Sequence, residues 1–181
     1  MNEKIKKRKL ILDLDKTIWN CYDKNSNQIW AKQLVPPFFL SIDNNELIDD
    51  VGGVCRLKEG FRAFVEKVFD LDLTISYLSV GARLEVPLEH QPSFLALKKF
   101  QVLKYFSGDN YLLYKTKKKL NYFNKNYIYL FIDDSDEILK SVNDLEYVET
   151  IDAKVIKSWN QVTPKVQEFI NTNYLERKVK N

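Results

Sequence analysis

Apolar residues in this chain form short uninterrupted runs that are separated by segments of helical spacing. Such runs, without polar alternation, are typical of strands buried on both faces. They predict strands at Leu10–Leu12, Leu71–Val80, Tyr127–Ile132 and Tyr147–Ile151, with a short one following Tyr105–Phe106. Apolar spacing of three and four residues predicts helices over Glu59–Phe69, Ser93–Tyr105, Thr116–Asn124, Ile138–Val142 and Thr163–Tyr174. Strands that alternate with helices indicate an α/β fold with a parallel sheet flanked by helices.

The segment 20–58 departs from this pattern. It is polar and irregular, with breakers at Pro36–Pro37 and Gly52–Gly53, and its apolar pieces are short. These features favour β-ribbon and loops, so we expect a small β-rich cap over the strand ends. A length of 181 residues suits one core, and residues 1–181 are therefore interpreted as a single domain with the cap inserted at 20–58.

Composition narrows the functional classes. The net charge is +3 with the basic residues in a few runs, which are usually solvated, so nucleic acid is not favoured as a partner. A single His and two widely spaced Cys do not support a zinc site. Because no apolar stretch is long enough for a signal peptide or a membrane span, we expect a soluble cytoplasmic protein without membrane contact.

Chemistry-bearing residues follow three of the predicted strands. Asp13 and Asp15 come after the first, Ser79 ends the second, and Asp133 with Asp134 ends a third, with the lysine cluster 115–119 shortly before it. The carboxyl ends of parallel strands meet at one edge of a sheet, where ligands bind. Crowded carboxylates require a cation, and an all-oxygen site without His or Cys suits Mg²⁺. Phosphate is a fitting second ligand, because Mg²⁺ and an ammonium group would neutralise its oxygens.

These residues resemble the haloacid dehalogenase superfamily, whose Asp-x-Asp-x-Thr motif corresponds to Asp13–Thr17. The small magnesium-dependent phosphatases within it are the most similar, because DLDKTIW, Pro36-Pro37-Phe38, the basic Lys115 region and the acidic IDDSDE all have counterparts there. The resemblance covers nearly the whole chain. It implies a three-layer Rossmannoid fold and a Mg²⁺-dependent phosphatase that cleaves phosphomonoesters. The substrate would be a phosphorylated small molecule, such as a sugar phosphate, or a phosphoprotein, including one with phosphotyrosine.

The resemblance also implies residue roles. Asp13 would attack phosphorus and form an aspartyl-phosphate, while Asp15 would protonate the leaving oxygen and later activate water. The implied metal ligands are Asp13, Asp15 through its backbone carbonyl, and Asp133 or Asp134. The implied phosphate-binding residues are Thr17, Ser79 and Lys115.

Several alternatives remain at the level of sequence. Ser79 is followed by Val80 and Gly81 where the family has Arg-Thr, with Arg83 displaced, and Ser76 is the alternative if the strand is shifted. Lys117, Lys118 or Lys119 could replace Lys115. Simpler interpretations are a helix cap at Asp15 or Thr17, a turn residue at Ser79 and a solvated Lys115. The altered second motif also leaves open a binding or scaffold protein that has the fold without turnover.

Overall fold

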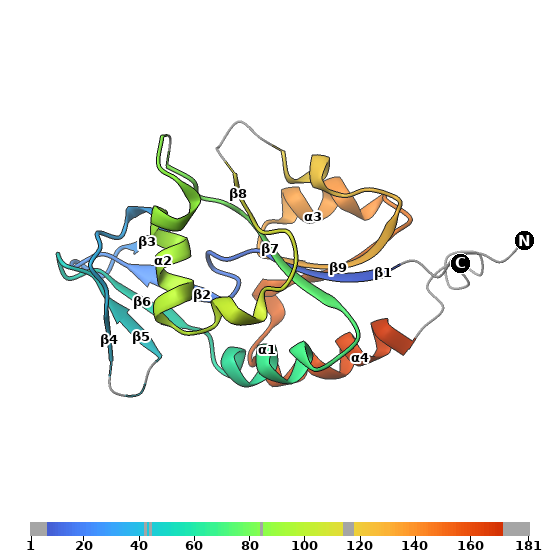
Figure 1. The fold of residues 1–181 in the computed structure, drawn as a ribbon, viewed down its shortest axis with the longest axis horizontal. Coiled ribbons are helices and arrows are strands. Elements are labelled where there is room, and N and C mark those ends of the chain that lie inside the picture. Colours follow the sequence, from blue (N-terminus) through green and yellow to red (C-terminus); the bar gives the residue numbers. More distant parts are fainter. Residues whose placement is uncertain (1–6, 42, 44, 84, 114–117, 172–181) are drawn as a thin grey trace, which may run out of the picture.

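Five parallel strands form the central sheet, in the order β10-β9-β1-β7-β8 (Figure 1). The structure is a computed structural model, which describes residues 7–41, 43, 45–83, 85–113 and 118–171. The strands are β1 (Lys7–Leu12), β7 (Thr74–Val80), β8 (Tyr111–Leu113), β9 (Tyr127–Asp133) and β10 (Val148–Asp152). Helix α3 (Asp136–Asn143) covers one face, and α1 (Phe61–Phe69) and α4 (Thr163–Asn171) cover the other. The predicted α/β class with a parallel sheet flanked by helices is confirmed.

The central strands lack polar alternation because both faces of the sheet are buried. In β1, Leu10 and Leu12 belong to one apolar cluster, which α1 and α4 also join. Ile11 belongs to a second cluster on the other face, with Phe131 of β9 and Val142 of α3. The uninterrupted apolar runs in the sequence therefore correspond to strands between two cores.

The predicted helix over Ser93–Tyr105 is wrong in its bounds. Helix α2 spans Pro92–Lys99, and Pro92 occupies its first turn, where a fixed φ and a missing N–H are tolerated. Ser93 is consequently inside the helix and buried, and it does not cap it. After α2 the chain turns at Gln101, which has a left-handed φ of 60°, and continues as a 3₁₀ helix at Leu103–Tyr105.

The structure also differs from two neighbouring predictions. No strand directly follows Tyr105–Phe106, because the chain leaves the 3₁₀ helix at Leu103–Tyr105 as an irregular segment and β8 begins only at Tyr111. The lysine-rich helix predicted over Thr116–Asn124 falls partly on residues 116–117, which lie outside the described residues. Its described part is a short 3₁₀ helix, η4 (Lys119–Tyr122). The strand prediction at Tyr147–Ile151 is confirmed by β10.

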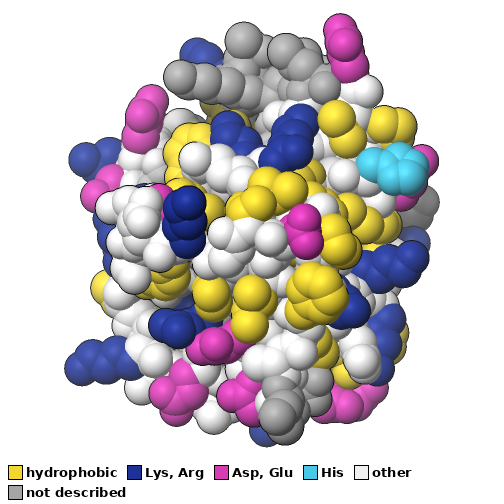
Figure 2. Space-filling model, turned by 90° about the vertical axis from the view of Figure 1, so that its left-hand side faces the viewer, with side chains coloured by type: hydrophobic (Ala, Val, Ile, Leu, Met, Phe, Trp, Pro, Cys, Tyr) yellow, Lys and Arg dark blue, Asp and Glu magenta, His cyan; other side chains and the backbone are white. Residues whose placement is uncertain are grey.

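A second sheet, antiparallel and in the order β3-β2-β6-β5-β4, occupies the predicted cap region beyond the strand ends (Figure 1). Its strands are β2 (Trp19–Tyr22), β3 (Gln28–Ile29), β4 (Phe39–Leu40), β5 (Glu46–Ile48) and β6 (Val54–Leu57). Figure 2 shows this end of the molecule, where apolar side chains lie among Lys and Arg side chains. Phe39 and its cross-strand partner Ile48 are both exposed there.

A disulfide bond joins β2 and β6. Cys21 and Cys55 face each other in the register of the two strands, and both are buried. The sequence did not predict this bond, since the register of the cap strands could not be derived from it. Disulfides persist mainly in oxidising compartments, so the bond does not support the predicted cytoplasmic location. None of the helices described is both long and apolar enough to cross a lipid bilayer.

Candidate metal and phosphate site

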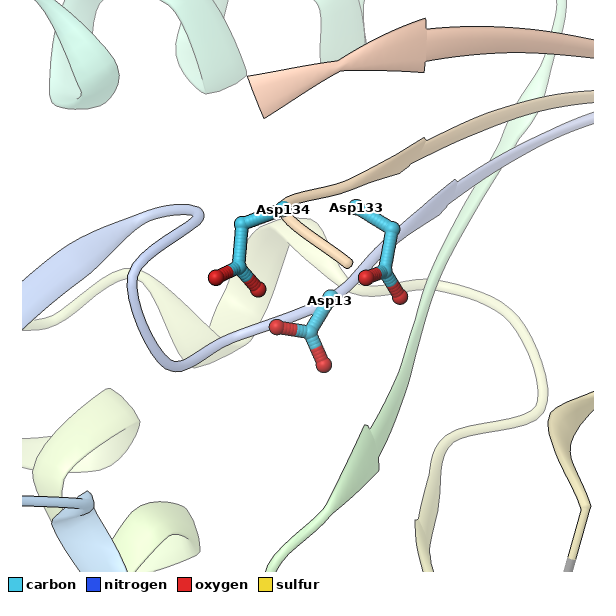
Figure 3. Close-up of side chains that lie close together, drawn as sticks. All are labelled: Asp13, Asp133 and Asp134. Carbon is cyan, nitrogen blue, oxygen red and sulfur yellow. The ribbon is translucent and has the colours of Figure 1, made fainter. Parts of the chain in front are cut away.

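Three carboxylates meet at the carboxyl ends of β1 and β9. Asp13 follows β1, and its N–H donates to the carbonyl of Ile132 on β9 at 2.9 Å, which brings the two strand ends together. Asp133 ends β9 and Asp134 follows it, and Figure 3 shows their side chains turned toward Asp13. One oxygen of each carboxylate lies within 4.8 Å of the others, so the three could hold a metal ion. This is the convergence that the strand pattern predicted.

Lys119 is the lysine that reaches this cluster. It comes from η4, its side chain is only 4% exposed, and its Nζ donates to Asp13 Oδ1 at 2.5 Å and to Asp133 Oδ2 at 2.6 Å. Burial alone would lower the pKa of Lys119, but the charges of the two carboxylates outweigh it and raise the pKa. Lys119 therefore carries a positive charge between two buried acids. Lys115 lies outside the described residues.

The ionised forms of Asp133 and Asp134 are disfavoured in spite of Lys119. Burial, followed by repulsion from Asp13, raises the pKa of Asp133 to about 6, although Lys119 and the Ser135 N–H act in the opposite direction. Burial and the charge of Asp13 also raise the pKa of Asp134, which is half-buried. A further cation would relieve this repulsion, since an opposite charge favours the ionised form of a carboxyl group.

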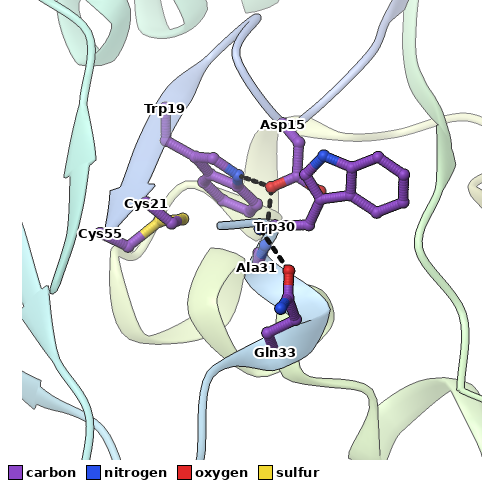
Figure 4. The surroundings of a disulfide bond; sticks show 7 residues. All are labelled: Asp15, Trp19, Cys21, Trp30, Ala31, Gln33 and Cys55. Atoms are coloured by element: carbon purple, nitrogen blue, oxygen red, sulfur yellow. Dashed lines mark hydrogen bonds between the residues drawn. A yellow bond between two sulfur atoms is a disulfide. The ribbon is translucent and has the colours of Figure 1, made fainter. Parts of the chain in front are cut away.

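Asp15 is turned back toward the site by a tight turn after β1. Lys16 adopts a left-handed φ of 62°, and the N–H groups of Thr17 and Ile18 donate to the carbonyl of Leu14. Asp15 Oδ1 then accepts hydrogen bonds from Trp19 Nε1 at 2.9 Å and from the Ala31 N–H at 2.8 Å (Figure 4).

The other oxygen of Asp15 is left without a partner. Asp15 Oδ2 is buried and has no hydrogen-bond partner among the described residues. Burial raises the pKa of Asp15 to about 6, and the two hydrogen bonds to Oδ1 only partly oppose this. A carboxyl group with such a pKa can hold a proton near neutrality and can also release it, as an acid–base catalyst must.

These groups line one pocket of about 240 Å³. Its polar lining comprises Asp13, Asp15, Lys16, Ser79, Lys119, Asp133, Asp134 and Ser135. Val80, Ile138 and the half-exposed Trp30 of the cap form its apolar lining. The pocket thus combines carboxylates, two ammonium groups and two hydroxyl groups, which is a suitable set for a metal ion and a phosphate.

Comparison with protein-family models and with curated proteins identifies no relative. No protein-family model matches the chain, and no curated protein shows significant similarity to it. The resemblance to the haloacid dehalogenase superfamily accordingly stays a prediction, supported by the residues quoted for it.

Other predicted site residues have distinct positions. Ser79 lines the pocket, whereas Ser76 lines a separate cavity bordered by Tyr111, so the geometry favours Ser79 over the alternative. The side chain of Thr17 is fully buried and does not line the pocket, and its role in phosphate binding stays a prediction. Arg83 does not line the pocket either, because its guanidinium binds backbone carbonyls of the cap.

Sequence reasoning missed the residues that orient Asp15. Trp19 and Ala31 donate to its carboxylate, and the sequence predicts neither of these hydrogen bonds. Trp19 follows the motif at a fixed spacing of four residues from Asp15, and this could have indicated a contact across the turn. Ala31 contributes only its backbone, and no sequence signal identifies such a donor.

Proposed function

We propose that this protein is a Mg²⁺-dependent phosphohydrolase that cleaves phosphomonoesters through an aspartyl-phosphate on Asp13. The observation that carries the proposal is the pocket that brings the acidic cluster of Asp13, Asp133 and Asp134 together with the partly buried Asp15. The two acids have different environments: Asp13 is bonded to an ammonium group, whereas burial raises the pKa of Asp15. Carboxyl groups in different environments can serve as nucleophile and acid in one reaction.

The residues present fit a magnesium ion. The ligand atoms are all carboxylate oxygens, from Asp13, Asp133 and Asp134, and Mg²⁺ prefers such hard donors. Burial, and after it the charge of Asp13, raises the pKa values of Asp133 and Asp134, and a bound cation would favour their ionised forms. When bound, Mg²⁺ would screen the charge of the phosphate from the attacking carboxylate.

The chain's own groups account for the proton and bond balance. A carboxylate oxygen of Asp13 forms a bond to phosphorus as the ester P–O bond breaks, and protonated Asp15 gives its proton to the leaving oxygen. The resulting Asp15 carboxylate then takes a proton from water as that water attacks phosphorus, which releases phosphate and regenerates both acids. Lys119 and Ser79 would hold the phosphate oxygens during both steps.

One observation favours a second candidate function, a binding or scaffold protein without turnover. Lys119 bonds to both Asp13 and Asp133 and so supplies a positive charge to the cluster without any metal. A protein that used the pocket only for binding would need no further cation. The two candidate functions differ in their need for Mg²⁺: the phosphatase requires it for turnover, whereas the scaffold does not.

The test is hydrolysis of p-nitrophenyl phosphate in the presence of Mg²⁺ or EDTA. We expect turnover with Mg²⁺, none with EDTA, and a loss of at least about a thousandfold in Asp13→Asn, as expected when a nucleophile is removed. Asp152→Asn is the matched control, because Asp152 also ends a parallel strand, next to Asp133, but does not line the pocket. Full activity of Asp13→Asn would exclude this nucleophile, and an inactive wild type that binds no Mg²⁺ would favour the scaffold.

A further inference from the structure

A turn of the cap, residues 30–34, holds the carboxylate of Asp15. The turn contains the 3₁₀ helix η1 (Ala31–Gln33), and its Ala31 N–H donates to Asp15 Oδ1. Within the turn, the side-chain oxygen of Gln33 accepts a hydrogen bond from the Trp30 N–H at 3.0 Å (Figure 4). The turn thus supplies one of the two hydrogen bonds that hold Asp15 Oδ1, and Trp19 supplies the other.

Arg83 also binds this turn. Its Nε donates to the carbonyl of Lys32 at 2.7 Å and its Nη2 to the carbonyl of Leu34 at 3.0 Å, so one guanidinium holds the turn at two points. Arg83 lies four residues after Ser79, at the end of the segment that leaves β7. Arg83 thereby links the end of β7, which carries Ser79, to the cap turn that binds Asp15.

The backbone of Arg83 is itself held by Gln91. The Arg83 N–H donates to Gln91 Oε1 at 2.8 Å, and Gln91 Nε2 donates to the carbonyls of Arg83 and Val86. Gln91 is only 2% exposed, so these bonds are shielded from water. Because the oxygen and the nitrogen of this buried amide both form hydrogen bonds, Gln91 holds the backbone of Arg83 in place beside the cap.

We propose that Arg83 is a positioning residue, which holds the cap turn so that the Ala31 N–H fixes Asp15 with its free oxygen available to the leaving group. This inference rests on the proposed function, since it gives Asp15 the acid role. Asp15 Oδ2 is buried in the pocket without a partner, and its position relative to the leaving oxygen depends on how Oδ1 is held. A displacement of about 1 Å in a reacting group can cost about a hundredfold in rate.

An arginine suits this role better than a lysine. The planar guanidinium presents donors in a fixed fork that reaches two carbonyls at once, whereas an ammonium is a point charge on a flexible stem. Arg83→Lys should therefore keep the charge and lose the two-point contact. Arg83→Met should lose both.

The experiment compares two substrates that differ in their need for an acid. p-Nitrophenyl phosphate has a good leaving group, which departs without a proton, whereas phenyl phosphate has a poorer one. For Arg83→Met we expect kcat on phenyl phosphate to fall about ten- to a hundredfold, and kcat on p-nitrophenyl phosphate to change by less than about threefold. KM should be unchanged on both substrates, and Arg83→Lys should fall between wild type and Arg83→Met.

Arg56→Met is the matched control. Arg56 is an exposed cap arginine that pairs with Glu46, on a sheet strand remote in sequence from the cap turn. Arg56→Met should leave kcat on both substrates unchanged. An equal loss on both substrates in Arg83→Met would indicate general damage to the fold and would overturn the positioning role, as would no loss on either.

Amide hydrogen exchange at Ala31 provides a readout that needs no turnover. In the metal-free protein, Arg83→Met should speed exchange of this amide at least about tenfold, because the turn that carries the amide is no longer held against Asp15. Arg56→Met should not change it. If the wild type hydrolyses neither ester, the proposed function fails, while unchanged exchange in Arg83→Met would separately overturn the link from Arg83 to Asp15.

Discussion

Replacing Lys119 by Met tests the electrostatics of the site in the absence of substrate. In the metal-free protein, the ammonium of Lys119 lies between the carboxylates of Asp13 and Asp133, and all three side chains are almost fully buried. The variant leaves two buried acids facing each other. Removing one partner of a buried ion pair costs about 3–5 kcal/mol of the free energy of unfolding.

The loss of stability in Lys119→Met has an upper bound, because one of the two carboxyl groups can take up a proton so that both charges need not stay buried. Each pH unit above the usual Asp pKa of about 3.9 costs 1.36 kcal/mol, so this protonation costs about 5–6 kcal/mol at pH 8 and about 1–2 kcal/mol at pH 5. We therefore expect Lys119→Met to lower the free energy of unfolding by about 3–5 kcal/mol at pH 8 but by only about 1–2 kcal/mol at pH 5.

The sign follows from the pKa of Asp133. It is raised to about 6 in the folded protein, and Lys119 acts to lower it, so the variant raises it further. A carboxyl group whose pKa is higher in the folded state binds its proton more tightly there. Its stabilising effect is then fully present below the unfolded pKa and is lost as the pH rises through the folded value. The variant should accordingly approach wild type as the pH falls from about 7 to 4.

Urea unfolding in EDTA at both pH values measures this effect. Lys118→Met is the matched control, because Lys118 is the exposed neighbour of Lys119 and should change stability by less than about 0.5 kcal/mol. Added Mg²⁺ should restore more stability to Lys119→Met than to wild type, since a bound cation stabilises the folded state that binds it. Equal stability of the two variants at pH 8, or a penalty that grows toward pH 5, would refute the reasoning.

Three further predictions concern the metal ligands, the acid and the disulfide. Asp134→Asn should weaken Mg²⁺ binding by about tenfold or more in calorimetric titration, because the cluster loses one anionic ligand, and an unchanged affinity would remove Asp134 from the ligand set. On phenyl phosphate, kcat/KM should decline as the pH rises through about 6, where Asp15 loses its proton, and Trp19→Phe should move the decline to higher pH because the Trp19 hydrogen bond lowers this pKa. A profile that is the same in both proteins would contradict this. Cys21→Ala combined with Cys55→Ala should lower the free energy of unfolding in urea by about 3–4 kcal/mol, because the bond spans a separation of 34 residues, and a loss under about 1 kcal/mol would contradict a constraint on the unfolded chain.

The acidic half of the site could be predicted from the sequence because it depends on regular structure. Apolar runs without alternation identify parallel strands, and the residues that follow parallel strands share one edge of the sheet. Asp13, Asp133 and Ser79 all lie at the ends of such strands and line one pocket. The same reasoning could not decide between Asp133 and Asp134, and the structure places both in the acidic cluster.

The cationic and hydrogen-bonding half could not be predicted, because it comes from irregular segments. Four candidate lysines within 115–119 precede β9, and only the path of the chain into η4 determines that Lys119 reaches Asp13. The Ala31 N–H belongs to a cap turn whose position depends on Arg83, 49 residues from Leu34 in the chain. No periodicity relates such residues, so propensity and pattern carry no information about their contacts.

Strand register explains why the acidic cluster depends on so few residues. Leu12 pairs with Ile132 between β1 and β9, and this pairing sets Asp13 beside Asp133. A slip of one residue would turn the side chain of Asp13 to the other face of the sheet and would also move Leu10 and Leu12 out of their core. The apolar residues of β1 thus fix the position of the carboxylate that follows them. The strand register that packs the core consequently also assembles the acidic cluster. The positions of Lys119 and Asp15, in contrast, depend on contacts that the sheet does not determine.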